Sequence, residues 1–513
     1  MKGTLRRARY RPAASALLLS FVLALAGCAG FQPAPRAPVS AIPEAQSTLW
    51  RELSAVRRDG WHRVLNGGED ALEWRLRLID SATSSIDLET FLWKPDASGA
   101  RVLRHLLAAA DRGVRVRILL DDSFTMHEDL ALHAIDEHAR IEYRIYNPFA
   151  RRHDNVVLRQ LLNLGEFGRV NRRLHNKTLI VDGRAAITGG RNIANEYFGL
   201  DPAFNFRDMD LLFAGAPVAD ATRHFDRFWN SRWAVPVEEF IAAPRDGKDL
   251  GAMRAWLDAG TDTVPAEPPA ARRMAWLAAA REGIAGEARF VADAPAPDAG
   301  SPAAAGNAAL LAQQLLALLD DAREDVVLVS AYLVPTPELE SAIARATGRG
   351  VRVRILTNSL RSNNHLAADS AYRRHLHALL ASGVELHEMH ALALDRDRYM
   401  RTPVEGKRIG LHAKLMLVDR DISYVGSCNL DPRSLRLNTE TGLVVRGAAL
   451  NGALRELLAA DFDARNAWAV SVAPDGAPQW RAQGEVRGAP PADSPVQRLE
   501  DWFLGVLPIE SQL

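Results

Sequence analysis

The sequence predicts an α/β protein made of two similar domains, each an αβα sandwich, which together form an internal pseudo-dimer. The first observation is a heptapeptide, Gly-Val-Arg-Val-Arg-Ile-Leu, that occurs at 113–119 and again, unchanged, at 350–356. The second is a group of four polar residues in each half that keeps the same offset of 237 positions. The third is an alternation of helix and strand patterns in both halves. A repeat that holds its register over such a distance indicates two copies of one fold.

Each copy contains the same series of expected elements. Apolar residues that recur every three or four positions predict helices, and short alternating or β-branched runs predict strands. In the first copy these are helix 69–81, strand 86–91, helix 100–112, strand 114–120 and strand 141–146. In the second they are helix 310–321, strand 326–331, helix 337–349, strand 351–357 and strand 384–388. Helices that alternate with buried strands imply sheets covered by helices.

The composition is that of an ordinary globular chain of 513 residues. Apolar residues make up 48% and charged residues 25%, which excludes a disordered tail, a collagen-like fibre and a coiled-coil rod. Lys+Arg and Asp+Glu both number 63, so the net charge is 0. A chain without a basic excess is a poor candidate for binding nucleic acid. Two cysteines, Cys28 and Cys428, are too few for a disulfide framework or a cysteine-ligated zinc site.

The first residues have the pattern of a secretion signal. Five basic residues, with no acidic residue among them, precede an apolar stretch that ends in Leu25-Ala26-Gly27-Cys28. These four residues resemble a bacterial lipobox, in which the cysteine receives a diacylglyceryl group and becomes the new N-terminus. The alternative is an uncleaved transmembrane anchor, because no charge occurs between Arg11 and Arg36. Cleavage before Cys28 would remove the five positive charges and leave a net charge of −5.

We therefore expect a lipid-anchored protein of the bacterial cell envelope that faces the periplasm. Ala29 after the cysteine, where Asp would favour the inner membrane, favours the outer membrane. The expected organisation is a lipoprotein signal peptide at 1–27, a tether at 28–50, a first domain at 51–241, a linker or insert at 242–307, and a second domain with a C-terminal extension at 308–513. The segment between the domains is rich in Ala, Pro and Gly.

Each copy carries one His-x-Lys-x4-Asp motif, followed by a turn that contains glycine and by an Asn. The residues are His175, Lys177, Asp182 and Asn192 in the first copy, and His412, Lys414, Asp419 and Asn429 in the second. Because side chains alternate along a strand, the His and the Lys of each motif face the same side. Each Asp should end its strand, and each turn lets backbone N–H groups and an Asn amide approach an anion.

If the two copies come together, two His, two Lys and two Asn converge, and this set suits a phosphodiester. Lys and Asn can neutralise and orient the non-bridging oxygens. One imidazole can attack phosphorus while the other protonates the leaving oxygen. A single His on a strand is more often structural, but four residue types that recur at identical spacing in both halves favour a catalytic role.

The paired motifs resemble the two H-x-K-x4-D signatures of the phospholipase D superfamily. Nearly the whole chain after Trp50 is similar to one branch, the bacterial cardiolipin synthases of type C. The supporting stretches are 91–93, 119–122, 146–149, 171–177, 189–193, 228–231, 429–434 and 507–511. The resemblance implies two phospholipase D-like αβα domains, phospholipid substrates in a membrane, and an enzyme that needs neither metal nor cofactor.

The resemblance also implies a role for each motif residue. One His forms a covalent phosphohistidine and the other acts as acid and then as base; we assign attack to His175 and proton transfer to His412. The phosphate would be held by Lys177, Lys414, Asn192 and Asn429. An acidic residue downstream of each motif would fix the ring of its His. We expect Glu440 to serve His412, and Asp208 to serve His175, with Asp210 as the alternative.

Several further residues have structural interpretations beside functional ones. Asp182 and Asp419 should stabilise the local strand and turn, and Cys428 should be a packed thiol. Three arginines ahead of the first motif, Arg169, Arg172 and Arg173, could meet lipid phosphates or belong to a solvated basic loop. Trp229 and Trp233 fit a core pattern, and Asp121-Asp122 more plausibly ends a strand than binds a metal.

Four functions are compatible with the motifs. The first is a phosphatidyltransferase that makes cardiolipin from phosphatidylglycerol and a second phospholipid. The second is a phospholipase D that uses water and releases phosphatidic acid. A nuclease is disfavoured by the charge balance and the membrane tether, and a non-catalytic lipid-binding lipoprotein by the intact pair of motifs. The family branch favours cardiolipin synthesis.

Overall fold

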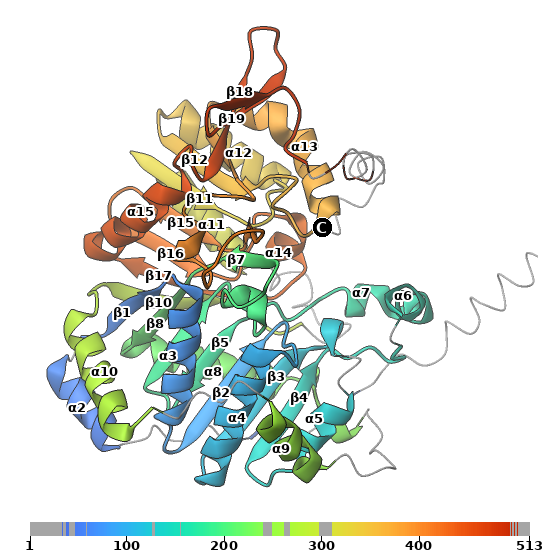
Figure 1. The fold of residues 1–513 in the computed structure, drawn as a ribbon, viewed down its shortest axis with the longest axis vertical. Coiled ribbons are helices and arrows are strands. Elements are labelled where there is room, and N and C mark those ends of the chain that lie inside the picture. The colour runs from blue at the N-terminus through green and yellow to red at the C-terminus, as the bar shows by residue number, and fades with distance from the viewer. Residues whose placement is uncertain are drawn as a thin grey trace, which may run out of the picture.

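The computed structural model shows two α/β halves stacked along the long axis of the molecule (Figure 1). It describes residues 33, 37–39, 47–57, 59–125, 129–153, 155–239, 249–260, 267–296 and 310–492, together with 494, 497 and 500. The predicted signal peptide, Cys28 and most of the predicted tether lie outside the described residues, as does the stretch 507–511. Within the described part of the chain, no helix is long and apolar enough to cross a membrane.

The first half is built on one eight-stranded mixed sheet. Its strands, in spatial order, are β1 (Trp61–Leu65), β8 (Asp210–Ala214), β6 (Ala185–Gly189), β5 (Thr178–Val181), β2 (Ser85–Thr90), β3 (Arg115–Asp121), β4 (Ile141–Tyr146) and β9 (Ala234–Pro236). Strands β2, β3 and β4 run parallel, and the other neighbours pair antiparallel. The carboxyl ends of the parallel strands therefore share one edge of the sheet.

The second half repeats this order strand for strand and adds two strands at one side. Its ten strands are β10 (Glu287–Ala292), β17 (Thr441–Arg446), β16 (Ile422–Gly426), β15 (Leu415–Val418), β11 (Asp325–Val329), β12 (Arg352–Asn358), β13 (Glu385–Met389), β18 (Ala467–Val472), β19 (Pro478–Ala482) and β20 (Glu485–Arg487). Strands β11, β12 and β13 are the parallel ones. The α/β pseudo-dimer predicted from the repeat is confirmed.

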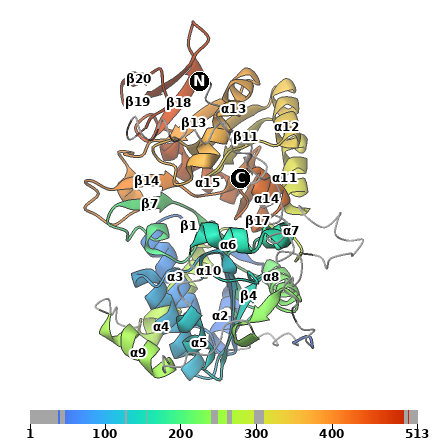
Figure 2. The same cartoon turned by 90° about the vertical axis from the view of Figure 1, so that its right-hand side faces the viewer.

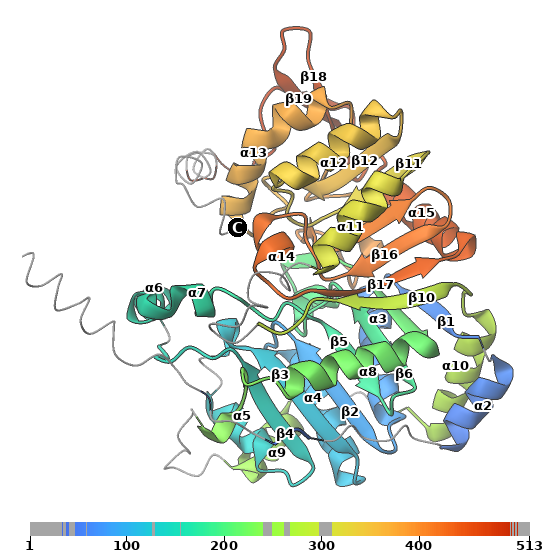
Figure 3. The same ribbon diagram turned by 180° about the vertical axis from the view of Figure 1, so that it is seen from behind.

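Helices cover both faces of each sheet. In the first half they are α2 (Thr48–Val56), α3 (Gly68–Asp80), α4 (Ala97–Asp111), α5 (Asp129–Asp136), α6 (Val156–Leu162), α7 (Phe167–Val170), α8 (Ala216–Trp229), α9 (Leu250–Ala259) and α10 (Pro269–Glu282). In the second half they are α11 (Leu310–Asp321), α12 (Pro337–Gly348), α13 (Leu366–Ala381), α14 (Pro432–Arg436) and α15 (Ala448–Asp461). Helices α3 and α4 lie on one face of the first sheet (Figure 1), and α8 lies on the other (Figure 3).

The segment predicted as a linker or insert, 242–307, folds with both halves in its described parts. Helix α10 packs on the first half, where Trp276 is fully buried against Trp50 with ring centroids 5.5 Å apart. Strand β10 pairs with β17 and takes the edge position in the second sheet that β1 takes in the first. The second repeat therefore begins upstream of position 308, because its first strand precedes α11.

The two halves share an apolar core and a two-stranded parallel ladder. One buried cluster draws on both sheets, and in it Phe213 and Phe290 stack with centroids 6.4 Å apart. Strand β7 (Phe204–Arg207) of the first half pairs in parallel with β14 (Arg408–Leu411) of the second. Figure 2 shows these two strands side by side between the halves. The ladder fixes the register of one half against the other.

Candidate active site

The two motif histidines begin the middle strands of their sheets. His175 lies just before β5 and His412 just before β15, and their residues are 7% and 5% exposed. The apolar residues that follow each motif Lys carry these strands into the core. The Nζ atom of Lys177 donates to the His175 carbonyl over 2.8 Å, and Lys414 donates to the His412 carbonyl. Each Lys thus lies beside the His of its own motif.

The motif aspartates stabilise the ends of these strands, as the sequence suggested. Asp182 has a positive φ of 55° and accepts hydrogen bonds from three successive backbone N–H groups, those of residues 83–85. Its Oδ2 atom also accepts from the Trp50 indole over 2.7 Å. Asp419 has a φ of 49° and accepts from the backbone of residues 323–325. Neither carboxylate reaches toward the histidines.

The carboxylates that hold the histidines come from the opposite halves. The Nδ1 atom of His175 lies 2.8 Å from Glu440 Oε2, and Nδ1 of His412 lies 2.7 Å from Asp208 Oδ2. The sequence-based assignment of Glu440 to His412 and of Asp208 to His175 is therefore wrong, although the same four residues form the pairs. Asp210, the alternative partner of His175, instead binds the guanidinium groups of Arg75 and Arg191 at 3.0 and 2.9 Å.

The exchange has a simple cause in the strand register between the halves. Arg207 pairs with Leu411 in the parallel ladder, so the residues that follow, Asp208 and His412, lie next to each other. A matching parallel bridge joins Leu174 to Thr439, and the residues after it are His175 and Glu440. Each His therefore meets the acid that follows the partner strand.

In each turn, the residue after the first glycine contacts one of the two carboxylates that hold the histidines. A Cβ atom added to Gly190 would lie 2.1 Å from Asp208 Oδ1, so only glycine leaves room for this carboxylate. Ser427 holds the equivalent place in the second half, and its hydroxyl donates to Glu440 Oε2 over 2.5 Å. In the structure these turns contact the two carboxylates, and their approach to a substrate anion stays a prediction.

In the site without substrate, burial and the neighbouring lysines favour the neutral form of both imidazoles. Burial, reinforced by Lys177 and Lys414, lowers the pKa of His175 well below its ordinary value. Burial and Lys414 lower the pKa of His412 to about 3, against the opposing effect of Asp208. Because a carboxylate holds Nδ1, the proton is assigned to that nitrogen, and the Nε2 lone pair of each ring is left for the reacting phosphorus or oxygen.

The two carboxylates differ in charge state. Burial raises the pKa of Glu440 to about 8, even though Lys177 and Ser427 oppose it. For Asp208 burial acts in the same direction, but His412 and Lys414 outweigh it and hold the pKa of that carboxyl well below its ordinary value. Asp208 is therefore ionised, and this difference between the halves distinguishes the two histidines.

The two ammonium groups supply the positive charge of the site. Burial lowers the pKa of Lys177 to about 7 and that of Lys414 to about 8, and each Lys also feels the other half's carboxylate. Asn192 and Asn429 are buried, and among the described residues their side-chain oxygens have no hydrogen-bond partner. The two lysines lie beside the histidines, and the binding of phosphate by these four side chains stays a prediction.

Aromatic rings form the walls beside the histidines and were not assigned a role from the sequence. The Phe91 ring meets the His175 ring edge-on at 5.0 Å. Tyr197 and Phe206 contact the His412 ring at 5.0 and 5.1 Å. Phe91 belongs to a stretch that supports the family resemblance, but nothing local to Tyr197 or Phe206 in the sequence indicates such a contact.

The other residues singled out in the sequence have structural positions. Trp229 and Trp233 are buried in the core, as expected. Asp121 ends β3 and accepts from the Leu174 backbone over 2.8 Å, which ties this strand end to the first motif. Arg169 and Arg173 are hydrogen bonded to Asn147, so neither belongs to a freely solvated loop.

Cys428 lies in the core of the second half. Cys428 is a free, buried thiol, and burial raises its pKa well above the ordinary value. This agrees with the interpretation of a packed thiol. Within the ranges that the structure describes, no group of three His, Cys, Asp or Glu residues is arranged to hold a metal ion.

Comparison with known proteins points to one family. The family model described as "Cardiolipin synthase, PLD-like domain" matches residues 76–229 and again 315–462. The chain is 33% identical to cardiolipin synthase C of Escherichia coli over 86% of this chain and 93% of that protein. It is 28% identical to cardiolipin synthase A of Pseudomonas aeruginosa over 78% of this chain and 66% of that protein.

A solved structure supports the fold. Phosphatidylserine synthase of Haemophilus influenzae superposes with a TM-score of 0.51 at 15% identity, over 80% of this chain and 89% of that one. The repeated family match, the extent of the sequence similarity and the paired motifs agree. The chain belongs to the cardiolipin synthase family with phospholipase D-like domains, and it is a phosphatidyltransferase of the phospholipase D type.

Proposed function

We propose that the protein makes cardiolipin from phosphatidylglycerol and a second phospholipid through a phosphohistidine intermediate. The observation that carries the proposal is the exchanged pair of His–carboxylate contacts, which leaves two Nε2 atoms available in a site that holds two Lys. The homology to proteins named cardiolipin synthase supports the choice of product.

In the first step His175 Nε2 attacks the phosphorus of one phospholipid. His412 enters this step as the imidazolium, with a proton on Nε2 and the Asp208 carboxylate at Nδ1. A P–N bond forms, the P–O bond to the headgroup breaks, and His412 gives its Nε2 proton to the leaving oxygen. In the second step His412 takes a proton from the hydroxyl of the acceptor lipid. That oxygen attacks phosphorus, the P–N bond breaks, and His175 is released. Lys177 and Lys414 offset the charge on the non-bridging oxygens in both steps.

The carboxylates support this division of roles. An ionised Asp208 stabilises the positively charged imidazole that His412 must be before it gives its proton and that it becomes again after it acts as the base. Glu440, with its raised pKa and its bond from Ser427, stabilises a cation less, which favours a neutral nucleophile. The attacking residue is therefore assigned as His175 and the proton carrier as His412.

The alternative is a phospholipase D in which water replaces the acceptor lipid. A nuclease is disfavoured, since the chain has no basic excess. Incubation with phosphatidylglycerol, with and without phosphatidylethanolamine, followed by mass spectrometry separates these activities. Cardiolipin is expected. Phosphatidic acid as the only product would establish the hydrolase, and cleavage of DNA without lipid turnover would refute both lipid activities.

Two variants test the mechanism in the same assay. His175→Ala and His412→Ala should each abolish turnover, because a nucleophile and an acid cannot replace one another. His377→Ala, on the exposed side of α13, is the control and should leave turnover unchanged. Full activity in either catalytic variant would contradict the two-histidine mechanism.

We further propose that a diacylglyceryl group on Cys28 holds the enzyme at the periplasmic side of the cell envelope, with the outer membrane favoured. The lipobox-like sequence and Ala29 support this. Cys28→Ala should release the protein from washed membranes. Unchanged membrane association would instead favour an uncleaved anchor.

A further inference from the structure

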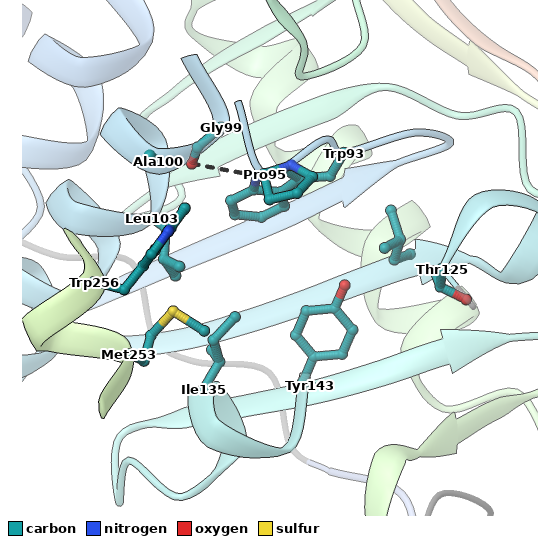
Figure 4. A pocket seen from close by; sticks show the side chains of 11 residues that line it. Trp93, Pro95, Gly99, Ala100, Leu103, Thr125, Ile135, Tyr143, Met253 and Trp256 are labelled. Atoms are coloured by element: carbon teal, nitrogen blue, oxygen red, sulfur yellow. Dashed lines mark hydrogen bonds between the residues drawn. The ribbon is translucent and has the colours of Figure 1, made fainter. Parts of the chain in front are cut away.

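A cavity of about 370 Å³ lies on the α4 face of the first sheet. Figure 4 shows side chains from several elements that point into it. They include Trp93 after β2, Leu103 of α4, Thr125 after β3, Tyr143 of β4, and Met253 and Trp256 of α9. The cavity size falls within the range of small-molecule sites, roughly 300–1,000 Å³.

The lining is mostly hydrocarbon, and its polar side-chain groups are the Trp93 indole and the hydroxyls of Thr125 and Tyr143 (Figure 4). None of the described residues that line the cavity carries a charged side chain. The Trp93 indole N–H donates to the Gly99 carbonyl over 3.3 Å, and the Thr125 hydroxyl donates to Asp122 over 2.6 Å. These two polar groups are therefore satisfied within the protein. A ligand that fits this lining is apolar along its length.

Part of the cavity lining follows the carboxyl ends of β2 and β3, since Trp93 lies after β2 and Thr125 after β3. In the sheet, Glu89 near the end of β2 pairs with Thr178 at the start of β5, three residues after His175. The Phe91 ring lies between the His175 ring at 5.0 Å and the Phe124 ring at 5.4 Å. Trp93 and Thr125, which line the cavity, are close in sequence to these two phenylalanines. The segments that follow β2 and β3 therefore contribute both to the surroundings of His175, through Phe91 and Phe124, and to the cavity, through Trp93 and Thr125.

We propose that this cavity binds one acyl chain of the phospholipid whose phosphodiester reacts at His175. An apolar cavity of about 150 Å³ accommodates a benzene ring. By proportion, 370 Å³ has room for a chain of roughly 12 to 15 carbons. The inference rests on the proposed phospholipid substrate and adds a site that selects for the chain.

Ala100→Trp fills the cavity and tests the proposal. Ala100 lines the cavity on α4, whereas Ala108 on the same helix is exposed, so Ala108→Trp is the matched control. In mixed micelles, Ala100→Trp should raise KM for dipalmitoyl phosphatidylglycerol about tenfold. KM for the dihexanoyl lipid should change less than twofold, and the control should change neither. An equal effect on both lipids, or none on the long-chain lipid, would overturn the proposal.

A binding measurement separates this proposal from the proposed reaction. Phosphatidylglycerol with a diazirine on one chain should crosslink to peptides that contain Trp93 or Trp256, and Ala100→Trp should abolish those crosslinks. If the wild-type enzyme crosslinks there but turns over neither lipid, the proposed reaction fails and the acyl site stands. Crosslinks confined to other peptides would refute the acyl site.

A second, independent observation concerns exposed apolar residues at the same edge of the first half. Of the 13 large apolar side chains exposed among the described residues, six lie near α6 and α7; these six, the α6–α7 surface, are Phe124, Leu158, Leu161, Leu162, Leu164 and Phe167. Arg159 of α6 donates to the Ser123 carbonyl, which places the helix beside Phe124. Both helices project from the body of the molecule (Figures 1 and 3).

The segment that carries this surface has an excess of Arg, of which Arg151 is exposed, whereas Arg159 and Arg173 are buried. Segment 151–173 contains six Arg and two acidic residues, although the whole chain is neutral. Exposed leucines beside basic residues are typical of elements that lie in a membrane interface. The segment also leads directly into His175. We infer that the α6–α7 surface inserts into an anionic bilayer and brings the site to its lipid.

A fluorescent label tests this inference in the full chain with Cys28→Ser. Leu161→Cys and Leu394→Cys, whose leucines are 57% and 55% exposed, are labelled with an environment-sensitive dye. Vesicles that contain phosphatidylglycerol should raise the emission at position 161 several-fold, and spin-labelled lipid chains should quench it. Position 394, in the second half, should not respond. Equal responses at both positions, or none at 161, would refute the inference.

Discussion

The exchange of carboxylates between the halves makes a kinetic prediction that separates the two histidines. In Asp208→Asn, the carboxylate that holds His412 loses its charge. Asp208 Oδ1 accepts from the Met209 backbone N–H over 2.7 Å, and Oδ2 faces His412. An Asn that keeps the first contact presents its NH2 group to Nδ1, so the ring must carry its proton on Nε2. The variant therefore impairs the acid and base, not the nucleophile.

The size of the effect follows from the contacts. A hydrogen bond to a charged group contributes about 1.5–3 kcal/mol, which is about 10- to 150-fold in rate. If the His412 ring also adopts the other tautomer, the loss of rate can be larger. In serine proteases the same change costs about 10⁴-fold. Glu440→Gln should cost less, about 2- to 12-fold, because the raised pKa of Glu440 makes its bond to His175 closer to a neutral one of about 0.5–1.5 kcal/mol.

The assay compares two leaving groups. The p-nitrophenyl ester of phosphatidic acid releases a stable anion that needs no proton, so its burst reports nucleophilic attack alone. Asp208→Asn should leave the burst rate within about twofold while lowering turnover of phosphatidylglycerol at least about tenfold. Glu440→Gln should slow the burst. Asp220→Asn, at an exposed position of α8, is the control. The reverse pattern, with the burst sensitive to Asp208 and not to Glu440, would refute the assignment of His175 as the nucleophile and of His412 as the acid.

Four further outcomes are expected. Burial lowers the pKa of Lys177 to about 7, so its charge is lost above that pH and kcat/KM should decline as pH rises from about 6 to about 9; a flat profile would contradict this. Asp182→Ala leaves three backbone N–H groups and an indole without an acceptor, and should lower the free energy of unfolding by at least about 3 kcal/mol. Its thermal midpoint should therefore fall further than that of Asp419→Ala, because the site of Asp419 is partly exposed to water. Gly190→Ala would push a methyl group to 2.1 Å from the carboxylate beside the acid histidine and should lower kcat at least tenfold, whereas Gly168→Ala, with open space around it, should match the wild type. Turnover should persist in EDTA, because lysines supply the positive charge of the site. If EDTA abolishes turnover and a divalent metal ion restores it, this prediction is wrong.

The sequence determined the fold class because its signals are local or repeated. Helix 69–81 and strand 114–120 appear as α3 and β3, within one residue at each end. The offset of 237 residues required two copies of one fold, and the duplicated motif identified both histidines and both lysines. Such signals depend on side-chain periodicity and spacing within a segment, which a single chain displays directly.

The role of segment 242–307 could not be read in the same way. Its composition suggested a linker, yet β10 completes the second sheet and α10 buries Trp276 in the first half. A strand of six residues at a sheet edge has a weak pattern of its own, and its pairing with β17 depends on a partner about 150 positions away. The sequence contains the strand, but only tertiary pairing assigns it to a domain.

The pairing of acids with histidines is the clearest case. The sequence identified His175, His412, Asp208 and Glu440, and proximity along the chain matched each acid to the His of its own half. The structure reverses the match, because Arg207 pairs with Leu411 and Leu174 with Thr439 across the boundary between the halves. Which chemical groups are present follows from the sequence. Which group meets which is decided by the register between two domains, since that register depends on how their surfaces pack and not on spacing within either copy.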